Sequence, residues 1–135
     1  MPITMTPVND GKGLLVKGCG HISDQEYRHF IFDKLLQIPG ETVEHRFCFH
    51  DYSGVESVGV HNETISEAGK RAAAVFENNP DVLMAVAAPS DLIFGLANMW
   101  SAWADKKRAN TRLFRDSKEA RQWLRKEVFG SQAVA

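Results

Sequence analysis

A continuous apolar run at residues 82–88 constrains the fold of this chain more than any other feature. A strand with one face in water alternates apolar and polar residues. An unbroken run of this length instead predicts a strand covered on both faces, as in a parallel sheet packed against helices. The run is too short to span a membrane. Pro89 has no N–H to donate to a neighbouring strand, and Ser90 or Asp91 can cap a helix that begins there.

The segment that follows predicts a helix over residues 91–107. On a wheel of about 100° per residue, its apolar side chains span an arc of roughly 160°, wider than the roughly 100° stripe that a surface helix needs. One interpretation is a helix wedged between the sheet and neighbouring helices. The other is that the Phe94 side and one edge of the arc meet a second subunit or a ligand. The arc holds Leu92, Ile93, Leu96, Ala97, Met99, Trp100, Trp103 and Ala104, and Phe94 lies outside it.

The remaining segments show strand and helix patterns in turn. Asp10-Gly11 favours a hairpin between the first two strands, and Ser23 and Glu26 have the spacing of a capping box at the start of the first helix. The patterns predict strands over 3–6 and 13–18, a helix over 23–37, a strand over 43–50, an irregular connector over 55–62, a helix from 62 or 63 to 78, a strand over 111–115 and a last helix from 116.

This order predicts one α/β domain over residues 1–130. Its sheet is mixed, mostly parallel and five-stranded, with an N-terminal antiparallel hairpin, and about four helices pack on it. Residues 131–135 are expected to form a frayed C-terminal tail. A chain of 135 residues is long enough to bury one core.

Charge and cysteine content narrow the possible functions. The chain has 16 basic and 17 acidic side chains and a net charge of −1, which argues against nucleic acid or an anionic membrane surface as a partner. We expect neither an export signal nor membrane insertion. Cys19 falls at the end of one predicted strand and Cys48 within another, which indicates two reduced core thiols and a cytoplasmic location.

Four stretches in the C-terminal half together carry a family resemblance. They are residues 88–91 (Ala-Pro-Ser-Asp), 94–100 (Phe-Gly-Leu-Ala-Asn-Met-Trp), 114–116 (Phe-Arg-Asp) and 120–124 (Ala-Arg-Gln-Trp-Leu). They resemble the SpoIIAA-like group of bacterial proteins, which is related to the STAS domains of anti-anti-sigma factors and sulfate transporters. The resemblance implies a small α/β domain that acts as a regulatory binding module. Some STAS relatives are switched by phosphorylation of a serine, and some have been linked to nucleotide binding.

The phosphorylated serine of those relatives can be looked for directly. Residues 51–55 (Asp-Tyr-Ser-Gly-Val) resemble the strand end of anti-anti-sigma factors, in which the phosphorylated serine follows five or six residues after the valine. Here the corresponding window, residues 59–62, reads Gly-Val-His-Asn and contains no serine. Ser57, Thr64 and Ser66 are nearby hydroxyls that a loop or a helix cap explains. The usual phosphorylation switch is therefore not expected.

The carboxyl edge of the predicted sheet gathers polar side chains. Ligands of parallel α/β sheets bind at this edge, where helix N-termini present free N–H groups, so an anion or a small polar ligand could bind there. Alternatively, these side chains only cap helices, and Arg115 pairs with Asp51 or Asp91. A metal site from His50, Asp51 and His61 lacks a further spaced ligand, so no metal or cofactor is expected. The candidate ligand-binding residues are Asp51, Ser53, Ser90, Asp91, Arg115 and Asp116.

Three functions follow, and no catalytic residue is expected in the first two. The favoured one is a non-enzymatic regulatory or ligand-binding module of STAS type, which binds a small ligand or a regulatory protein and forms a homodimer through Phe94, Ala97, Trp100 and Trp103. The second is a carrier of a small apolar ligand or lipid, because the SpoIIAA-like fold has been compared with SEC14 domains and Phe94, Trp100 and Trp103 could line a cavity. The third is an enzyme that uses Asp51, Asp91 and Arg115.

Overall fold

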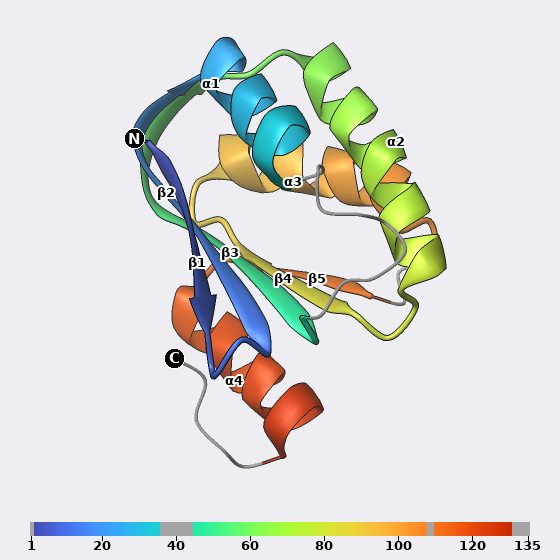
Figure 1. Cartoon of the computed structure of the whole chain (residues 1–135). Helices are drawn as coiled ribbons and strands as arrows, with labels where there is room; N and C mark the ends of the chain where they lie inside the picture. Colours follow the sequence, from blue (N-terminus) through green and yellow to red (C-terminus); the bar gives the residue numbers. More distant parts are fainter. Residues whose placement is uncertain (1, 36–44, 108–109, 131–135) are drawn as a thin grey trace.

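Five strands form one mixed sheet in the order β1-β2-β3-β4-β5 in the computed structural model, which describes residues 2–35, 45–107 and 110–130 (Figure 1). β1 and β2 are antiparallel, and the other three neighbouring pairs are parallel. The predicted mixed sheet with its N-terminal hairpin is therefore confirmed. The strands are β1 (Ile3–Val8), β2 (Gly13–Ser23), β3 (Phe47–Gly59), β4 (Leu83–Ala87) and β5 (Thr111–Phe114).

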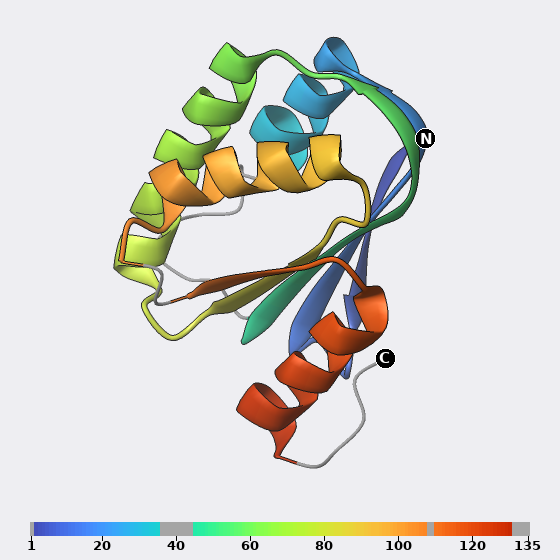
Figure 2. The same cartoon turned by 180° about the vertical axis from the view of Figure 1, so that it is seen from behind.

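The helices cover both faces of this sheet unequally. α1, α2 and α3 lie on one face and α4 lies on the other (Figures 1 and 2). Each of the first three connects two parallel neighbours in the same direction across the sheet, and right-handed crossovers of that kind put all three helices on one face. The helices are α1 (Asp24–Arg28), which continues as the π-helix η1 (His29–Leu35), α2 (Asn62–Asn78), α3 (Asp91–Ala104) and α4 (Ser117–Phe129).

Two hydrophobic clusters lie on the two faces of the sheet. Cys48, Met84 and Val86 belong to the cluster under α1, α2 and α3, whereas Phe49 and Ala85 belong to the cluster under α4. Successive residues of a strand point to opposite faces, so a strand between two helix layers buries every side chain. This is why the residues of the run at 82–88 are all apolar. The prediction of a strand covered on both faces is confirmed.

The far half of β3 corrects the sequence interpretation. Residues 55–62 were expected to form an irregular connector, but β3 continues to Gly59 and pairs with β2 as far as Ser23. Two register shifts in β2, between Lys17 and Cys19 and between Gly20 and His21, allow the long pairing. Beyond Asp51 this ribbon no longer pairs with β4, so it extends past the body of the sheet.

The extended ribbon also explains the exposure of Cys19. Both cysteines were expected in the core, and Cys48 is buried, but Cys19 is exposed. Cys19 lies just past the first register shift, where β2 pairs with the part of β3 that has left β4. One face of a strand in that position is open to solvent. The prediction of two core thiols was therefore wrong for Cys19.

Local signals place the turn and the helix starts. Asn9, Asp10 and Gly11 have φ angles of 53°, 57° and 81°, a left-handed conformation that these residue types tolerate. Ser23 and Glu26 form the expected capping box at α1. Several predicted ends lie outside the described residues: the helix end at residues 36–37, the strand start at 43–44 and the tail at 131–135.

Candidate functional site

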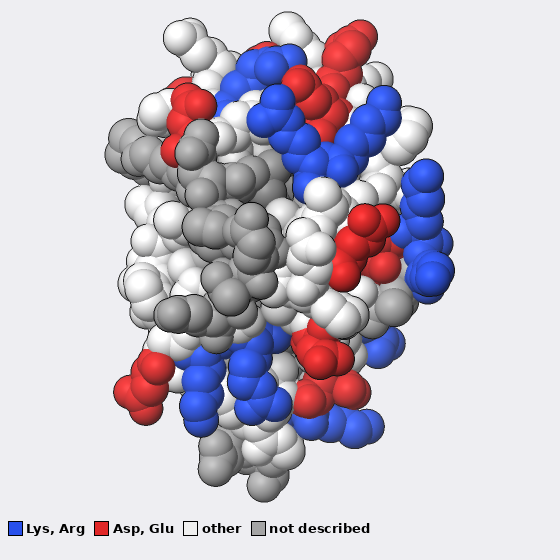
Figure 3. Space-filling view, turned by 45° about the vertical axis from the view of Figure 1, so that its right-hand side comes forward, with Lys and Arg blue, Asp and Glu red and all other residues white. Residues whose placement is uncertain are grey.

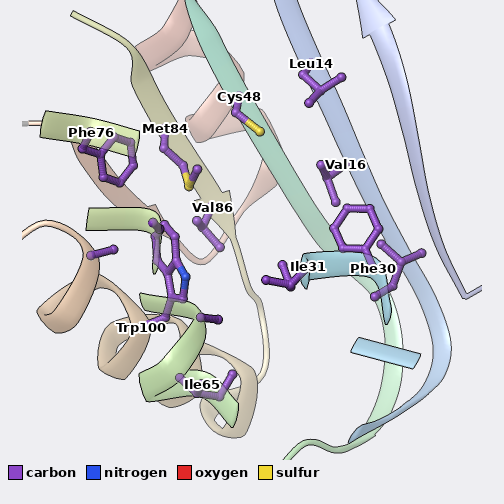
Figure 4. Close-up of a cluster of buried hydrophobic side chains, with 14 of the residues drawn as sticks. Leu14, Val16, Phe30, Ile31, Cys48, Ile65, Phe76, Met84, Val86 and Trp100 are labelled. Carbon is purple, nitrogen blue, oxygen red and sulfur yellow. The ribbon is translucent and has the colours of Figure 1, made fainter. Parts of the chain in front are cut away.

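A cavity of about 140 Å³ lies between the sheet and the helices α1, α2 and α3. Its walls are almost entirely apolar, and among the described lining residues there is no Lys, Arg, Asp or Glu. Figure 4 shows strand side chains such as Met84 and Val86 facing helix side chains such as Ile31 and Trp100. Folded interiors rarely leave a space of this size empty. The walls include Leu14, Ile65, Ala68, Ala72, Val75 and Ala97.

Two contacts between helices stabilise the layer of α1, α2 and α3 that covers the cavity. The Asp24 carboxylate at the start of α1 accepts hydrogen bonds from the His61 backbone N–H (2.9 Å) and the Thr64 hydroxyl (2.7 Å) at the start of α2. Phe76 of α2 meets Trp100 of α3 edge to face, with 6.3 Å between ring centroids. The helices are thus braced against one another above the sheet.

Five polar side chains border this apolar space among the described residues, Tyr27, His45, Cys48, His50 and Tyr52, and two of them are joined. His50 and Tyr52 are two residues apart on β3, and His50 Nδ1 lies 2.8 Å from the Tyr52 hydroxyl oxygen. Burial lowers the pKa of His50 to about 4, so the imidazole is neutral at physiological pH. Burial, with Tyr27 and Cys48 nearby, raises the pKa of Tyr52. Burial likewise raises the pKa of Tyr27, and that of Cys48 to about 12.

One atom of this group has no partner. His50 is 5 % exposed, and its Nε2 is buried without a hydrogen bond to any described residue. A buried polar atom in that state costs about 1 to 3 kcal/mol. From the sequence, His50 was a candidate only for a metal site, and its pairing with Tyr52 was not predicted. The sequence contained a signal for this pairing. Residues two apart on a strand share a face, so two polar residues at this spacing in an apolar strand can contact each other.

The residues of the predicted strand-end site are paired with each other or with helix termini. Asp51 is buried and accepts hydrogen bonds from the Ser53 backbone N–H (3.0 Å) and hydroxyl (2.6 Å). It lies inside β3, not at its end. Ser90 and Asp116 cap helices by accepting from the Ile93 and Lys118 backbone N–H groups.

The same edge brings one predicted pair together. Arg115 Nη1 lies 2.6 Å from Asp91 Oδ1, and both side chains are exposed. Ligand binding at this edge stays a prediction, since capping and this ion pair account for the contacts observed there. Neither Asp51, Asp91 nor Arg115 lines the cavity.

The hydroxyls near the expected phosphorylation window have local partners. The Thr64 hydroxyl donates to Asp24, and the Ser66 hydroxyl donates to the Glu63 carbonyl. Ser57 Oγ lies 2.7 Å from His21 Nδ1 on the β2–β3 ribbon. Among the described residues no group of three or more His, Cys, Asp or Glu is placed to hold a metal ion.

The four predicted interface residues do not form one surface. Trp100 is buried and lines the cavity together with Ala97. Phe94 is half-buried under the Arg115 guanidinium, 4.1 Å from its ring centroid, whereas Trp103 is 37 % exposed. Phe94 and Trp103 are nine residues apart, which is two and a half helical turns, so they lie on opposite sides of α3. Of the aromatics expected to line a cavity, only Trp100 does so.

On the face drawn in Figure 3, positive and negative side chains are mixed. In Figure 3, Lys and Arg side chains alternate with Asp and Glu side chains over one face. Arg28, Glu67 and Arg71 form one such mixed group through ion pairs. Among the described residues, no helix has both the length and the apolar character needed to cross a membrane.

Comparison with known proteins shows the fold and nothing finer. No family model matches the sequence, and no curated protein matches it either. A solved structure of an uncharacterised protein of the DUF3478 family, with a SpoIIAA-like fold, from Shewanella loihica PV-4 superposes with a TM-score of 0.57. The two chains share 16 % sequence identity, over 90 % of this chain and 91 % of the other. This chain therefore has the SpoIIAA-like fold, as the resemblance read from its sequence implied.

Proposed function

We propose that this protein is a non-enzymatic binding module that holds a small apolar ligand in the cavity between its sheet and the helices α1, α2 and α3. The single observation that carries the proposal is the apolar cavity of about 140 Å³. An empty space of this kind leaves the side chains around it without partner atoms on one side. A ligand that fills the space makes those contacts, and they contribute favourably to its free energy of binding.

The size of the cavity limits what it can hold. An engineered cavity of about 150 Å³ in another protein binds benzene. The ligand, or the part of it that enters this cavity, is therefore about as large as benzene. A longer lipid would keep the rest of its chain outside this space.

The alternatives receive less support from the side-chain contacts. An enzyme built on Asp51, Asp91 and Arg115 would need these groups to meet a bound substrate, and none of them borders the cavity. A switch by phosphorylation would need a serine that residues 59–62 do not contain. A regulatory role remains compatible with the proposal, because ligand binding can itself be the signal.

Benzene binding tests the proposal directly. Titration of the purified protein, followed by NMR shifts of the methyl groups around the cavity, should show saturable binding. Ala97→Leu places a larger side chain in the cavity wall, and Ala102→Leu makes the same change at an exposed position of the same helix. Ala97→Leu should weaken benzene binding at least tenfold, at a cost of about 1.4 kcal/mol or more. Ala102→Leu should leave it unchanged. Wild-type protein that neither binds benzene nor carries a small molecule in native mass spectra would refute the proposal.

Self-association through α3 is a second proposal, favoured by one observation. Leu92 and Trp103 are 60 % and 37 % exposed, and they are large apolar residues. They are eleven residues apart, close to three helical turns, and so lie on the same side of α3. An apolar flank of this kind is typical of a surface that pairs with a second copy.

A further inference from the structure

Among the described residues that line the cavity, His50 presents a buried side-chain nitrogen without a hydrogen-bond partner. Its ring lines the cavity, and Nε2 is buried without a partner among the described residues. A water molecule in that place would need two to four polar partners. The neighbouring walls offer mainly hydrocarbon, since Val16 and Val86 flank His50 on the adjacent strands. A ligand is therefore the better partner for Nε2.

The contact with Tyr52 decides which hydrogen-bonding role Nε2 has. The Tyr52 hydroxyl has one proton to donate, and His50 Nδ1, at 2.8 Å, is the partner that the described residues give it, so we assign the proton of this contact to Tyr52. A neutral imidazole that accepts at Nδ1 carries its proton on Nε2. Nε2–H is then a donor, and it needs an acceptor atom from the ligand.

The rest of the wall decides the charge of the ligand. No Lys, Arg, Asp or Glu lines the cavity among the described residues, so a charged ligand would be buried without a counter-ion, which is costly. The second histidine of the wall, His45, comes just before β3, and its Nδ1 lies 3.0 Å from the Gly11 carbonyl oxygen in the β1–β2 turn. A neutral ligand fits this wall.

We infer that His50 anchors the ligand by donating a hydrogen bond from Nε2 to an acceptor oxygen, such as a carbonyl, on a neutral compound with a small hydrocarbon body. The inference rests on the proposed function and names the chemical class that the cavity takes. It makes His50 and Tyr52 the residues that set selectivity. The apolar wall supplies affinity and disfavours an anion, and the Nε2–H group selects a neutral acceptor over a pure hydrocarbon.

Three small probes separate these contributions. Hexan-2-one has the acceptor oxygen, 2-methylhex-1-ene has a methylene group in place of that oxygen, and hexanoate has a similar size with a negative charge. Their dissociation constants would be measured by NMR titration on wild-type protein and on His50→Phe, which keeps a ring at the position. The ratio of ketone to alkene affinity is compared between the two proteins, because this cancels the different solubilities of the probes in water.

The ketone-to-alkene ratio should fall about tenfold in His50→Phe, the effect of one buried hydrogen bond and its unsatisfied donor. Hexanoate should not bind at concentrations that saturate the protein with hexan-2-one. An unchanged ratio, or hexanoate binding as strong as that of the ketone, would overturn the inference while the proposed function stands. Failure of both hexan-2-one and 2-methylhex-1-ene to bind would overturn the inference, and failure of benzene as well, with no small molecule in native mass spectra, would overturn the proposed function too.

The imidazole nitrogens of His50 give a readout that needs no variant, so the test survives if His50→Phe does not fold. In wild-type protein the nitrogen shifts should identify the tautomer with the proton on Nε2. Hexan-2-one should move the Nε2–H resonance, and 2-methylhex-1-ene should leave it near its ligand-free position. A proton on Nδ1, or an Nε2 bound to water that the ketone does not displace, would contradict the anchoring role.

Discussion

Gly69 on α2 packs directly against Trp103 on α3: a Cβ atom placed on Gly69 would lie 2.6 Å from Trp103 Cβ and 2.8 Å from the Trp100 carbonyl oxygen. No side chain fits at that separation, so the two helices approach as closely as they do because residue 69 is glycine. The same two helices form part of the cavity wall. The distance between α2 and α3 therefore depends on the glycine at position 69.

Gly69→Ala should destabilise the protein in spite of the better helix propensity of alanine. Forcing the helices apart costs about 1 to 3 kcal/mol of unfolding free energy, which outweighs the gain of about 1 kcal/mol from the propensity. Gly95→Ala on α3 is the matched control, because a Cβ there meets nothing within 4 Å. It should stabilise the protein by about 0.5 to 1 kcal/mol. Chemical denaturation of both variants measures the difference, and equal effects at the two sites would contradict the close-packing argument.

Acid should weaken the fold through His50. Burial lowers the pKa of His50 from 6.5 to about 4, so between these values the unfolded chain binds a proton that the folded protein does not. Unfolding free energy is then greatest above about pH 6.5 and falls as the pH drops toward 4, by up to about 3 kcal/mol. His50→Phe should remove most of this slope.

Denaturant midpoints measured between about pH 4 and 7 check this dependence. The control is His29→Gln, at an exposed position on η1 where the side chain is 54 % exposed. That variant should keep the wild-type slope. A His50→Phe protein that loses stability with acid as steeply as wild type would show that other groups control the acid response.

The strand and helix order was predictable because each element carries its own signal. The apolar run at 82–88 and the caps at Ser23 and Ser90 act locally, and the tertiary structure agrees with them. The far half of β3 was missed because Gly54 and Gly59 are typical of loops, and its pairing with β2 depends on register shifts that only long-range contacts establish.

From the sequence, a cavity was expected only under the second of the three functions, the carrier of a small apolar ligand. Whether apolar side chains meet or leave a space depends on the distance between layers, which pairs such as Gly69 and Trp103 determine. The helical wheel placed Leu92 and Trp103 within the buried arc, yet both are exposed, near the same edge of it. An arc of apolar residues shows that a helix is buried but does not fix its rotation about its own axis.

Asp105 should matter far more for stability than Asp91, at the other end of the same helix. Asp105 is buried, and its Oδ2 accepts hydrogen bonds from the backbone N–H groups of Asn110 (2.8 Å) and Thr111 (2.7 Å), which ties the end of α3 to the start of β5. Asp105→Ala should cost about 3 kcal/mol, because a buried and a half-buried backbone N–H both lose their acceptor. Asp91→Ala breaks an exposed ion pair with Arg115 and should cost less than about 1 kcal/mol. Thermal or chemical denaturation would rank the two, and a larger loss for Asp91→Ala would contradict the role given to Asp105.

Light scattering decides whether α3 pairs two copies of the chain, and which side of it does so. We expect a dimer for wild-type protein and a monomer for Trp103→Glu, since a charge buried at the centre of an apolar contact is costly. Phe94→Glu should remain a dimer, because Phe94 lies on the opposite side of α3 under Arg115. Circular dichroism would confirm that both variants are folded. If Phe94→Glu alone becomes a monomer, the interface lies on the Phe94 side, as one interpretation of the sequence holds. If wild type is a monomer at all concentrations, the exposure of Leu92 and Trp103 has another cause and the pairing proposal fails.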